Sequence, residues 1–384
     1  MTDSRITALV VGCGIIGRHH GVVLTKHPSF TVTGLADPDP AMLDSASAAI
    51  VSAGGTAPTA YESLAEALEA RAAEVVIICT PSGLHLDQAL AALEYDVHLV
   101  IEKPLDVSVE RARQLVDAAE QAADRGRCVS VISQHRFNPA NVVVRDAIES
   151  GAFGQITSAT TTMAAHRSQR YYDQGAWRGT WRMDGGGAVM NQGIHHVDLL
   201  RWLLGRPVEI AAHTAQLGHE RIEIEDTATA TIRFESGALA TLLCTTAVYP
   251  SVPTRLQVHG SRGAAIVDDS RLEFFHALDG GPDHAEDPEN QAPQRVEAGE
   301  LRSSPRAADF FVTGHLRQYD DIADAITNKR PPVVTVTEAL LSLALVRAIY
   351  LSAALGAPVR FDDVLEGMVE THGASAVGSI GGAI

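Results

Sequence analysis

Short apolar runs alternate with helical patterns along the first third of the chain. The runs are rich in β-branched side chains and lie at residues 6–11, 31–36, 75–79, 97–101 and 128–133. Segments between the later runs, such as 85–94 and 108–125, carry Ala and Leu at helical spacing, and Ser108 can cap the second of them. Strands that alternate with helices predict a doubly wound parallel sheet, so we expect an α/β domain over residues 1–133.

The pattern changes after about Gln134 to longer strands of alternating polarity. Residues 227–234 and 238–246 flank Glu235-Ser236-Gly237, which predicts a hairpin. We therefore expect a second, α+β domain over residues 134–361, built on a large, mainly antiparallel open sheet.

The last part of the chain contains two helical patterns, at residues 315–328 and 336–355. Before them, residues 279–300 are rich in Asp, Glu, Gly and Pro and show no apolar periodicity, which predicts an exposed loop. Residues 362–384 end in a Gly- and Ala-rich stretch, and we expect a C-terminal tail that is partly mobile.

Composition excludes several classes of protein. The formal net charge of −17 argues against binding to nucleic acid or to anionic membranes, which requires Lys and Arg. We find no cleavable leader and no apolar stretch near the roughly 20 residues that span a bilayer, so we expect a cytoplasmic protein. The cysteines form no C-x-x-C pair, which argues against a zinc knuckle or a redox motif and predicts reduced, mostly buried thiols; we expect no metal site, and the four are Cys13, Cys79, Cys128 and Cys244.

A glycine-rich motif follows the first predicted strand directly and opens a helix. Its residues are Gly12-Cys13-Gly14-Ile15-Ile16-Gly17. In that context G-x-G-x-x-G lets the backbone approach a dinucleotide pyrophosphate, and the sequence predicts a Rossmann-type domain. A glycine-rich turn without a ligand is the alternative.

An acidic residue ends the second predicted strand. Asp37 stands 20 residues after Gly17, where a carboxylate accepts hydrogen bonds from the adenosine ribose of NAD. Asp39 adds a second negative charge, and no Arg or Lys stands beside the two to receive a 2′-phosphate. We therefore expect NAD in preference to NADP, the alternative being that Asp37 only caps a helix or is solvated.

Two further segments carry candidate catalytic residues. The fifth strand ends in Glu102-Lys103-Pro104, at the sheet edge where open α/β sheets bind ligands. In the second domain, residues 185–187 are all glycine and lead into a segment that contains Asn191 and His195. On a helix, residues four apart share one face, so Asn191 and His195 can address one substrate together.

These motifs together resemble the glucose-fructose oxidoreductase, inositol dehydrogenase and rhizopine-catabolism (Gfo/Idh/MocA) superfamily, over essentially the whole chain to about Phe361. Thr80-Pro81 and His135-Arg136-Phe137 belong to the same pattern. The resemblance implies an NAD-dependent oxidoreductase that acts on a hydroxyl of a sugar or sugar derivative. The cofactor contacts that we expect are Gly12, Gly14, Ile15, Ile16, Gly17, Asp37, Thr80, Ser82, His85, Glu102 and Lys103.

The same resemblance implies the catalytic roles. His195 would take the hydroxyl proton while hydride leaves for the nicotinamide, and Lys103 would polarise the oxygen, roles that suit both side chains. Taken singly, Lys103 could be a surface lysine and His195 a core histidine. Polyol dehydrogenases of the family carry an aspartate where this chain has Asn191, which we therefore interpret as a substrate hydrogen-bonding residue.

A basic, aromatic segment lies between His166 and Arg182. Aromatic faces suit sugar rings and Arg forks suit carboxylates or phosphates, so an anionic sugar such as a uronate or nucleotide sugar would fit. A subunit contact is an equal alternative. The substrate residues that we expect are Asn191, Tyr172, Trp177, Arg178 and Arg136.

Two other functions remain compatible with these motifs. Some members that resemble this family are glycosidases that oxidise and re-reduce the sugar with bound NAD. One member is a non-catalytic, NAD-binding sugar sensor, which the presence of Lys103 and His195 counts against. The family's exposed sheet face implies a homodimer or homotetramer.

Overall fold

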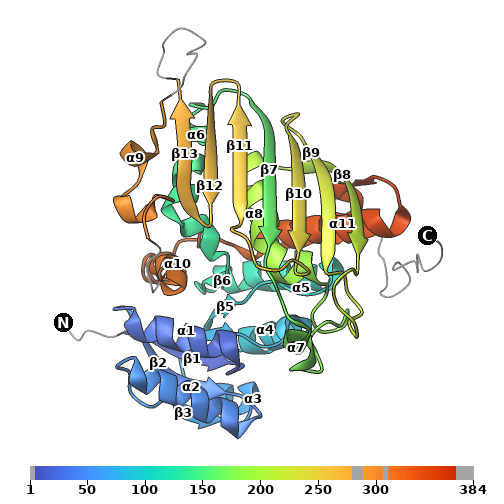
Figure 1. Cartoon of the computed structure of the whole chain (residues 1–384). Coiled ribbons are helices and arrows are strands. Elements are labelled where there is room, and N and C mark those ends of the chain that lie inside the picture. Colours follow the sequence, from blue (N-terminus) through green and yellow to red (C-terminus); the bar gives the residue numbers. More distant parts are fainter. Residues whose placement is uncertain (1–4, 279–288, 306–309, 369–384) are drawn as a thin grey trace. The chain divides into compact units, whose positions relative to one another are not determined.

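A computed structural model of the protein describes residues 5–278, 289–305 and 310–368 (Figure 1). The chain divides into two compact units, with the boundary between Gln134 and His135. The helix α10 (Phe310–Asn328) and the first residues of α11 (Val336–Leu355) return to the first unit. The rest of α11 belongs to the second unit.

The first unit contains a six-stranded sheet in which every strand is parallel to its neighbours, which confirms the predicted doubly wound fold. The strand order is β3-β2-β1-β4-β5-β6. The strands are β1 (Ile6–Val11), β2 (Phe30–Ala36), β3 (Thr59–Tyr61), β4 (Val75–Ile78), β5 (His98–Ile101) and β6 (Val129–Val131). Only β3 was not predicted, because its three residues are largely exposed and carry no apolar run.

Helices connect these strands, and their first turns explain where they begin. Ser108 Oγ accepts a hydrogen bond from Arg111 N, which confirms the predicted cap of α5, and Ser63 caps α3 in the same way. All residues of β4 and β5 are buried, as expected of strands covered on both faces. The helices are α1 (Ile15–Lys26), α2 (Pro40–Ser52), α3 (Leu64–Glu69), η1 (Ser82–Leu84), α4 (His85–Leu93) and α5 (Val109–Asp124).

The core of this unit explains why α10 belongs to it. Tyr319 and Ile322 of α10 are buried in the same apolar cluster as Val10 of β1 and Ile77 of β4. The side chain of Gln318 also donates a hydrogen bond to a main-chain oxygen of β6. This late helix therefore completes the core of a sheet whose strands all precede it in the sequence by more than 170 residues.

The second unit contains an eight-stranded sheet with the order β13-β12-β11-β7-β10-β9-β8-β14. Only the β7–β10 pair is parallel, so the predicted mainly antiparallel sheet is confirmed. Gly237 adopts a φ of +87° in the predicted hairpin between β9 and β10. The strands are β7 (Ile156–Ala164), β8 (Pro207–Ala215), β9 (Thr227–Phe234), β10 (Leu239–Thr245), β11 (Arg255–Gly260), β12 (Gly263–Asp268), β13 (Arg271–Ala277) and β14 (Val359–Arg360).

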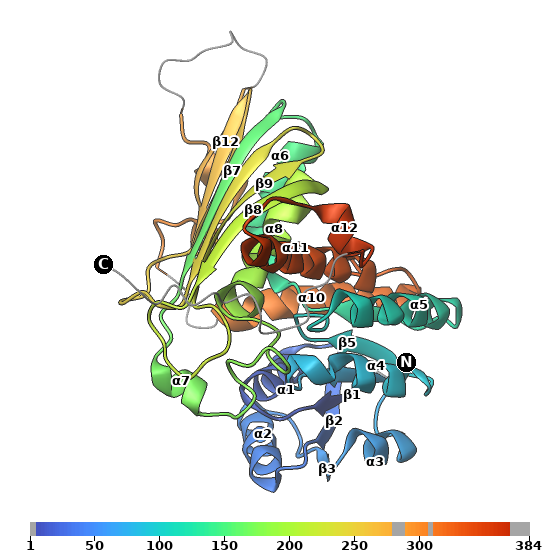
Figure 2. The same ribbon diagram turned by 90° about the vertical axis from the view of Figure 1, so that its right-hand side faces the viewer.

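Helices of this unit lie along one face of the sheet (Figure 2). Along β9, alternate side chains are buried beneath them, and the intervening threonines and Arg233 are exposed. The helices are η2 (Gln134–Phe137), which starts at the boundary, α6 (Pro139–Glu149), α7 (Gln169–Asp173), η3 (Ala188–Gly193), α8 (Ile194–Leu204), α9 (Ala292–Arg295), η4 (Ala298–Glu300) and α12 (Phe361–Leu365). Apart from α6, α8 and α11, the helical segments of this unit have at most six residues.

Three expectations need correction or completion. By length and composition alone, α11 could cross a membrane, contrary to expectation, but 67% of the relevant window is buried inside the protein, as in the core helix of a soluble protein. Residues 289–300 contain the short helices α9 and η4 as well as loop. Residues 279–288 and the end of the tail, from 369 onward, lie outside the described residues.

Candidate active site

The glycine motif forms the tight turn between β1 and α1 that a pyrophosphate requires. Gly12 has a φ of +85°, and a Cβ there would lie 2.8 Å from the backbone of Cys79 and Thr80. A Cβ at Gly17 would collide with the carbonyl of Gly12, so α1 can approach β1 this closely only if residue 17 is glycine. A Cβ at Gly14, by contrast, would meet nothing within 4 Å. Open space at the N-terminus of α1 fits a bound dinucleotide.

The side chains beside this turn fit the same ligand. Asp37 is half-buried, and its carboxylate accepts hydrogen bonds from Cys13 N at 2.7 Å and Asp39 N at 2.9 Å. These bonds hold the carboxylate at the end of β2 and leave lone pairs for a ribose. Asp39 is instead the N-cap of α2. Ile15 is 70% exposed, whereas Ile16 packs against the core.

The loop after β4 contains Thr80, Ser82 and His85. His85 is buried; its Nδ1 lies 2.8 Å from the carbonyl oxygen of Pro104, and its Nε2 lies 2.9 Å from that of Thr80. Burial lowers the pKa of His85 despite these carbonyls. The Thr80 hydroxyl donates to Gln88, and Ser82 is buried. His85 thus links the loops that follow β4 and β5.

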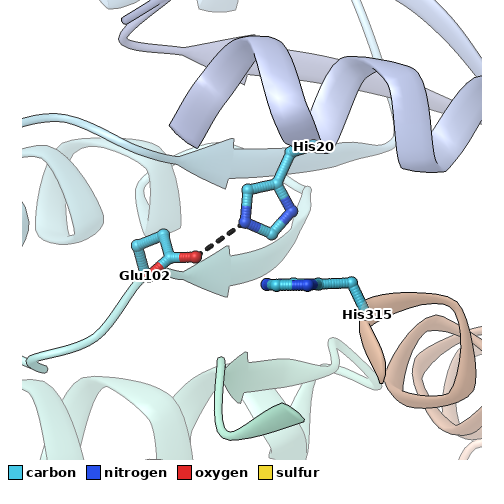
Figure 3. Close-up of side chains that lie close together, drawn as sticks. All are labelled: His20, Glu102 and His315. Carbon is cyan, nitrogen blue, oxygen red and sulfur yellow. Dashed lines mark hydrogen bonds and ion pairs between the residues drawn. The ribbon is translucent and has the colours of Figure 1, made fainter. Parts of the chain in front are cut away.

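Lys103 follows the end of β5 and is half-buried. Its backbone N–H donates to Glu102 Oε2 at 2.9 Å, and the other carboxylate oxygen lies 2.7 Å from His20 Nε2 (Figure 3). Burial raises the pKa of Glu102, but the hydrogen bond and charge of His20 and the charge of Lys103 outweigh it and bring the pKa to about 2. Glu102 is therefore ionised at neutral pH.

The segment that carries Asn191 is a π-helical turn, η3, and not the predicted α-helix; His195 lies in the first turn of α8, which follows it. Glu225 fixes the turn, because its carboxylate accepts from the N–H groups of Gly187 and Val189 at 2.9 Å. Burial raises the pKa of Glu225 to about 7. π-Helical turns are rare, and they occur frequently at functional sites.

A carboxylate that the sequence did not indicate contacts Asn191. Asp184 is buried, and its Oδ1 accepts a hydrogen bond from Asn191 Nδ2 at 2.8 Å. Its Oδ2 accepts from Gly179 N at 3.0 Å. Asn191 is therefore oriented with its amide oxygen away from Asp184, and a carboxylate lies beside the position where polyol dehydrogenases carry one.

Three histidines lie together in the second unit. The ring of His195, which is half-buried, is 4.7 Å from that of His135. His196 is buried and hydrogen-bonds Thr161, and burial lowers its pKa to about 3. Of the adjacent pair, His196 is thus a neutral core residue, and His195 is the one that solvent or a substrate can reach.

Arg136 lies in the core of the second unit. It is 2% exposed, and its guanidinium pairs with Asp198 through two hydrogen bonds of 2.7 and 2.5 Å. Asp198 also accepts from the hydroxyl of Ser342. A bidentate buried pair of this kind holds α8 against its neighbours.

The basic, aromatic segment brings Arg178 over two rings. Its guanidinium carbon is 4.4 Å from the ring centre of Tyr171 and 4.7 Å from that of Trp177. No carboxylate within the described parts of the chain forms an ion pair with Arg178. Tyr172 points elsewhere: it is buried, and its hydroxyl hydrogen-bonds Thr246 at 3.0 Å. Tyr171, which the sequence did not single out as a substrate residue, is therefore the tyrosine next to Arg178.

Among the residues that the structure describes, one group of three could hold a metal ion. It consists of His20, Glu102 and His315, whose ligand atoms lie within 4.8 Å of one another. All four cysteines are buried and free, as predicted. Burial raises their thiol pKa values, so they are protonated at neutral pH.

A doubly wound parallel sheet, a tight glycine turn between β1 and α1 and an acid at the end of β2 are the features of an NAD-binding Rossmann domain. Two family models match the chain: "Oxidoreductase family, NAD-binding Rossmann fold" over residues 6–132, and the "GFO/IDH/MocA C-terminal domain" over residues 142–266. The chain belongs to the Gfo/Idh/MocA family of oxidoreductases, which its motifs resemble.

Individual relatives match along most of the chain. The WlbA dehydrogenase of Bordetella pertussis, solved with NADH and UDP-GlcNAcA, is 32% identical, with a TM-score of 0.79 over 94% of this chain and 99% of its own. The WlbA enzyme of Chromobacterium violaceum, with the same ligands, is also 32% identical, with a TM-score of 0.76 over 94% and 97%. An inositol 2-dehydrogenase of Rhizobium meliloti is 26% identical over 81% of this chain and 84% of its own.

Proposed function

We propose that this NAD-dependent oxidoreductase oxidises a secondary hydroxyl of a negatively charged, nucleotide-linked sugar. The observation that carries the proposal is the full-length likeness to two WlbA dehydrogenases that bind UDP-GlcNAcA, a nucleotide-linked uronic acid. The stacked Arg178, which has no carboxylate partner among the described residues, supports an anionic substrate in a protein of net charge −17.

Lys103 and His195 are the residues to which we assign the chemistry. When bound, NAD⁺ supplies the hydride acceptor. His195 takes the proton from the substrate hydroxyl, because an accessible imidazole can accept a proton near neutrality. Lys103 donates a hydrogen bond to the same oxygen while negative charge develops on it. Asn191, oriented by Asp184, presents its amide oxygen to a neighbouring hydroxyl.

The other predicted residues divide into direct and indirect roles. Gly14 and Asp37 bind the cofactor directly, as does the exposed Ile15 through its apolar surface, and Gly12 and Gly17 allow the tight turn that brings the backbone to the cofactor. The other predicted residues act indirectly: their side chains are buried or bonded within the protein and hold the backbone around the site. They are Ile16, Thr80, Ser82, His85, Glu102, Tyr172 and Arg136.

The test of the activity is to incubate the protein with NAD⁺ and UDP-GlcNAcA and to follow NADH by its near-ultraviolet absorbance. We expect net NADH, and losses of roughly 10² to 10⁴ in turnover for Lys103→Ala and His195→Ala. Lys26→Ala and His213→Ala alter exposed residues of the same types and serve as controls. Turnover near wild type in both catalytic variants would refute the assignment.

The same assay separates the competing functions. A glycosidase that recycles bound NAD would release sugar without net NADH, and a sensor would bind the sugar without any reaction. The uncharged analogue UDP-GlcNAc tests the charge preference, since it keeps the diphosphate and lacks the carboxylate. We expect a lower kcat/KM for it, and a smaller difference between the two sugars in Arg178→Ala.

We also infer a cytoplasmic homo-oligomer. Four protonated, free cysteines suit a reducing compartment. The face of the sheet that the helices leave uncovered includes Leu239, which is 57% exposed. Light scattering at several protein concentrations measures the assembly, and a monomer throughout would contradict this inference.

A further inference from the structure

Three buried polar side chains of the first unit form a hydrogen-bonded chain that ends at the backbone of Lys103. His20 belongs to α1, Glu102 ends β5, and Tyr319 belongs to α10. None of them is more than 3% exposed. His20 Nδ1 lies 2.8 Å from the Tyr319 hydroxyl and its Nε2 lies 2.7 Å from Glu102, whose second oxygen accepts from Lys103 N at 2.9 Å. Figure 3 shows His20 directed at Glu102.

The ionised Glu102 fixes one proton of this chain of hydrogen bonds. Ionised Glu102 only accepts, so His20 Nε2 must carry the proton between them. Nδ1 accepts from the Tyr319 hydroxyl when the imidazole is neutral, and donates to the Tyr319 oxygen when the ring is an imidazolium. Burial raises the pKa of Tyr319 well above its usual value, so this donor stays protonated. Every bond of the chain therefore has one donor and one acceptor in either charge state of the His20 ring.

The geometry fits hydrogen bonds better than a metal ion. Two ligands of a tetrahedral zinc ion, each about 2.0–2.1 Å from it, lie roughly 3.3 Å apart. The 2.7 Å between His20 Nε2 and Glu102 Oε1 is too short for that and normal for a charge-assisted hydrogen bond. The third member of the group, His315, has its Nδ1 3.2 Å from His19 Nε2.

We propose that Tyr319, His20 and Glu102 form a hydrogen-bonded chain that positions Lys103 for catalysis. The inference rests on the proposed function of Lys103 and adds three positioning residues to it. Glu102 holds the backbone from which the lysine side chain extends, and His20 and Tyr319 fix Glu102. Because α1 begins at the glycine turn, the same chain of bonds connects the cofactor helix to the lysine. Misplacement of a catalytic group by about 1 Å can cost roughly 100-fold in rate.

The variant that tests the proposal is His20→Ala, in the full-length protein. We expect kcat to fall roughly 10- to 100-fold, while KM and the Kd for NAD⁺ change less than about threefold. His20→Gln keeps a side-chain N–H that can reach Glu102, and should recover part of the loss. Tyr319→Phe removes only the hydroxyl oxygen and should lower kcat by a smaller factor than His20→Ala does. It serves as the test variant if His20→Ala does not fold.

The matched control is His27→Ala. His27 is also buried, also lies at α1, and also pairs with a residue of α10, Asp320, at 3.0 Å, but it has no contact with Glu102. We expect it to lower thermal stability and to leave kcat of the folded protein near wild type. Equal losses of kcat in the His20 and His27 variants would overturn the proposal in favour of a general structural effect.

The decisive measurement combines His20→Ala with Lys103→Ala. If His20 acts through the lysine, the double variant loses no more activity than Lys103→Ala alone. Multiplicative losses would overturn the proposal, and so would stoichiometric zinc in the purified protein that His315→Ala removes. Failure of the proposed function is a different result: Lys103→Ala would then keep its turnover whatever stands at position 20.

Discussion

Replacing Arg136 with methionine tests whether this residue binds substrate, as its position in the sequence indicates, or stabilises the second unit. The substitution keeps the length of the side chain and removes its charge. Asp198, 5% exposed, would lose both hydrogen bonds of the pair and keep only the donor Ser342 among the bonds described above. Breaking a buried ion pair from one side costs about 3–5 kcal/mol, because a buried charge is left without compensation.

Thermal unfolding measures this loss. For a domain of about 150–250 residues, 1 kcal/mol lowers the Tm by about 2–4 °C, so Arg136→Met should lower the Tm of the second unit by about 6–20 °C. The control is Arg233→Ala, which breaks the exposed 3.5 Å pair with Glu209 and should cost about 0–1 kcal/mol. Replacing Asp198 with asparagine as well should restore part of the loss.

The opposite pattern would refute this reasoning. If Arg136→Met kept the wild-type Tm and raised KM for the sugar, the guanidinium would be a substrate ligand and its pair with Asp198 would contribute nothing to stability. A fall in both quantities that the second substitution reverses together would still support a structural role, since folding and binding then depend on one pair.

Two further variants test the cofactor site and a buried acid. Asp37→Asn should lower the ratio of NADP Kd to NAD Kd by roughly tenfold, about 1.4 kcal/mol, because the wild-type carboxylate repels a 2′-phosphate. Calorimetric titration with both cofactors measures this ratio. Glu225 has a folded pKa of about 7 against 4.5, so the stability it contributes is complete below about pH 4.5 and is lost as pH rises through 7. Between these pH values, the free energy of unfolding of the wild type should fall by up to about 3 kcal/mol more than that of Glu225→Gln. Equal pH dependence of the two free energies of unfolding would contradict the raised pKa.

The sequence predicted those parts of the fold that depend on local periodicity. The bounds of β1, β9 and α11 match the predicted ranges to the residue, because each is a sustained apolar pattern between clear turn or breaker residues. The return of α10 to the first unit was beyond such reasoning. Its apolar side chains show that it packs on something, and periodicity carries no information on which sheet that is.

Some features of the candidate site could also be predicted from the sequence, and others could not. The glycine turn and Asp37 could be predicted because their spacing is set by one βαβ unit. The π turn could not, because no residue type in 188–193 distinguishes a π turn from an α-helical one. The contact between Asp184 and Asn191 depends on that turn. Nor does the sequence distinguish His195 from His196; only burial separates an accessible base from a core residue.

Both candidate catalytic residues follow backbone that a buried glutamate holds in place. Glu102 accepts the N–H of Lys103, and Glu225 accepts two N–H groups at the start of the π turn that leads to His195. A buried carboxylate is costly unless donors surround it, so these acids are favourable only while the backbone keeps its position. The cost of burying these acids, ionised in Glu102 and partly protonated near neutral pH in Glu225, thereby becomes a penalty on any displacement of the loop, which is the preorganisation that positioned acid-base chemistry requires.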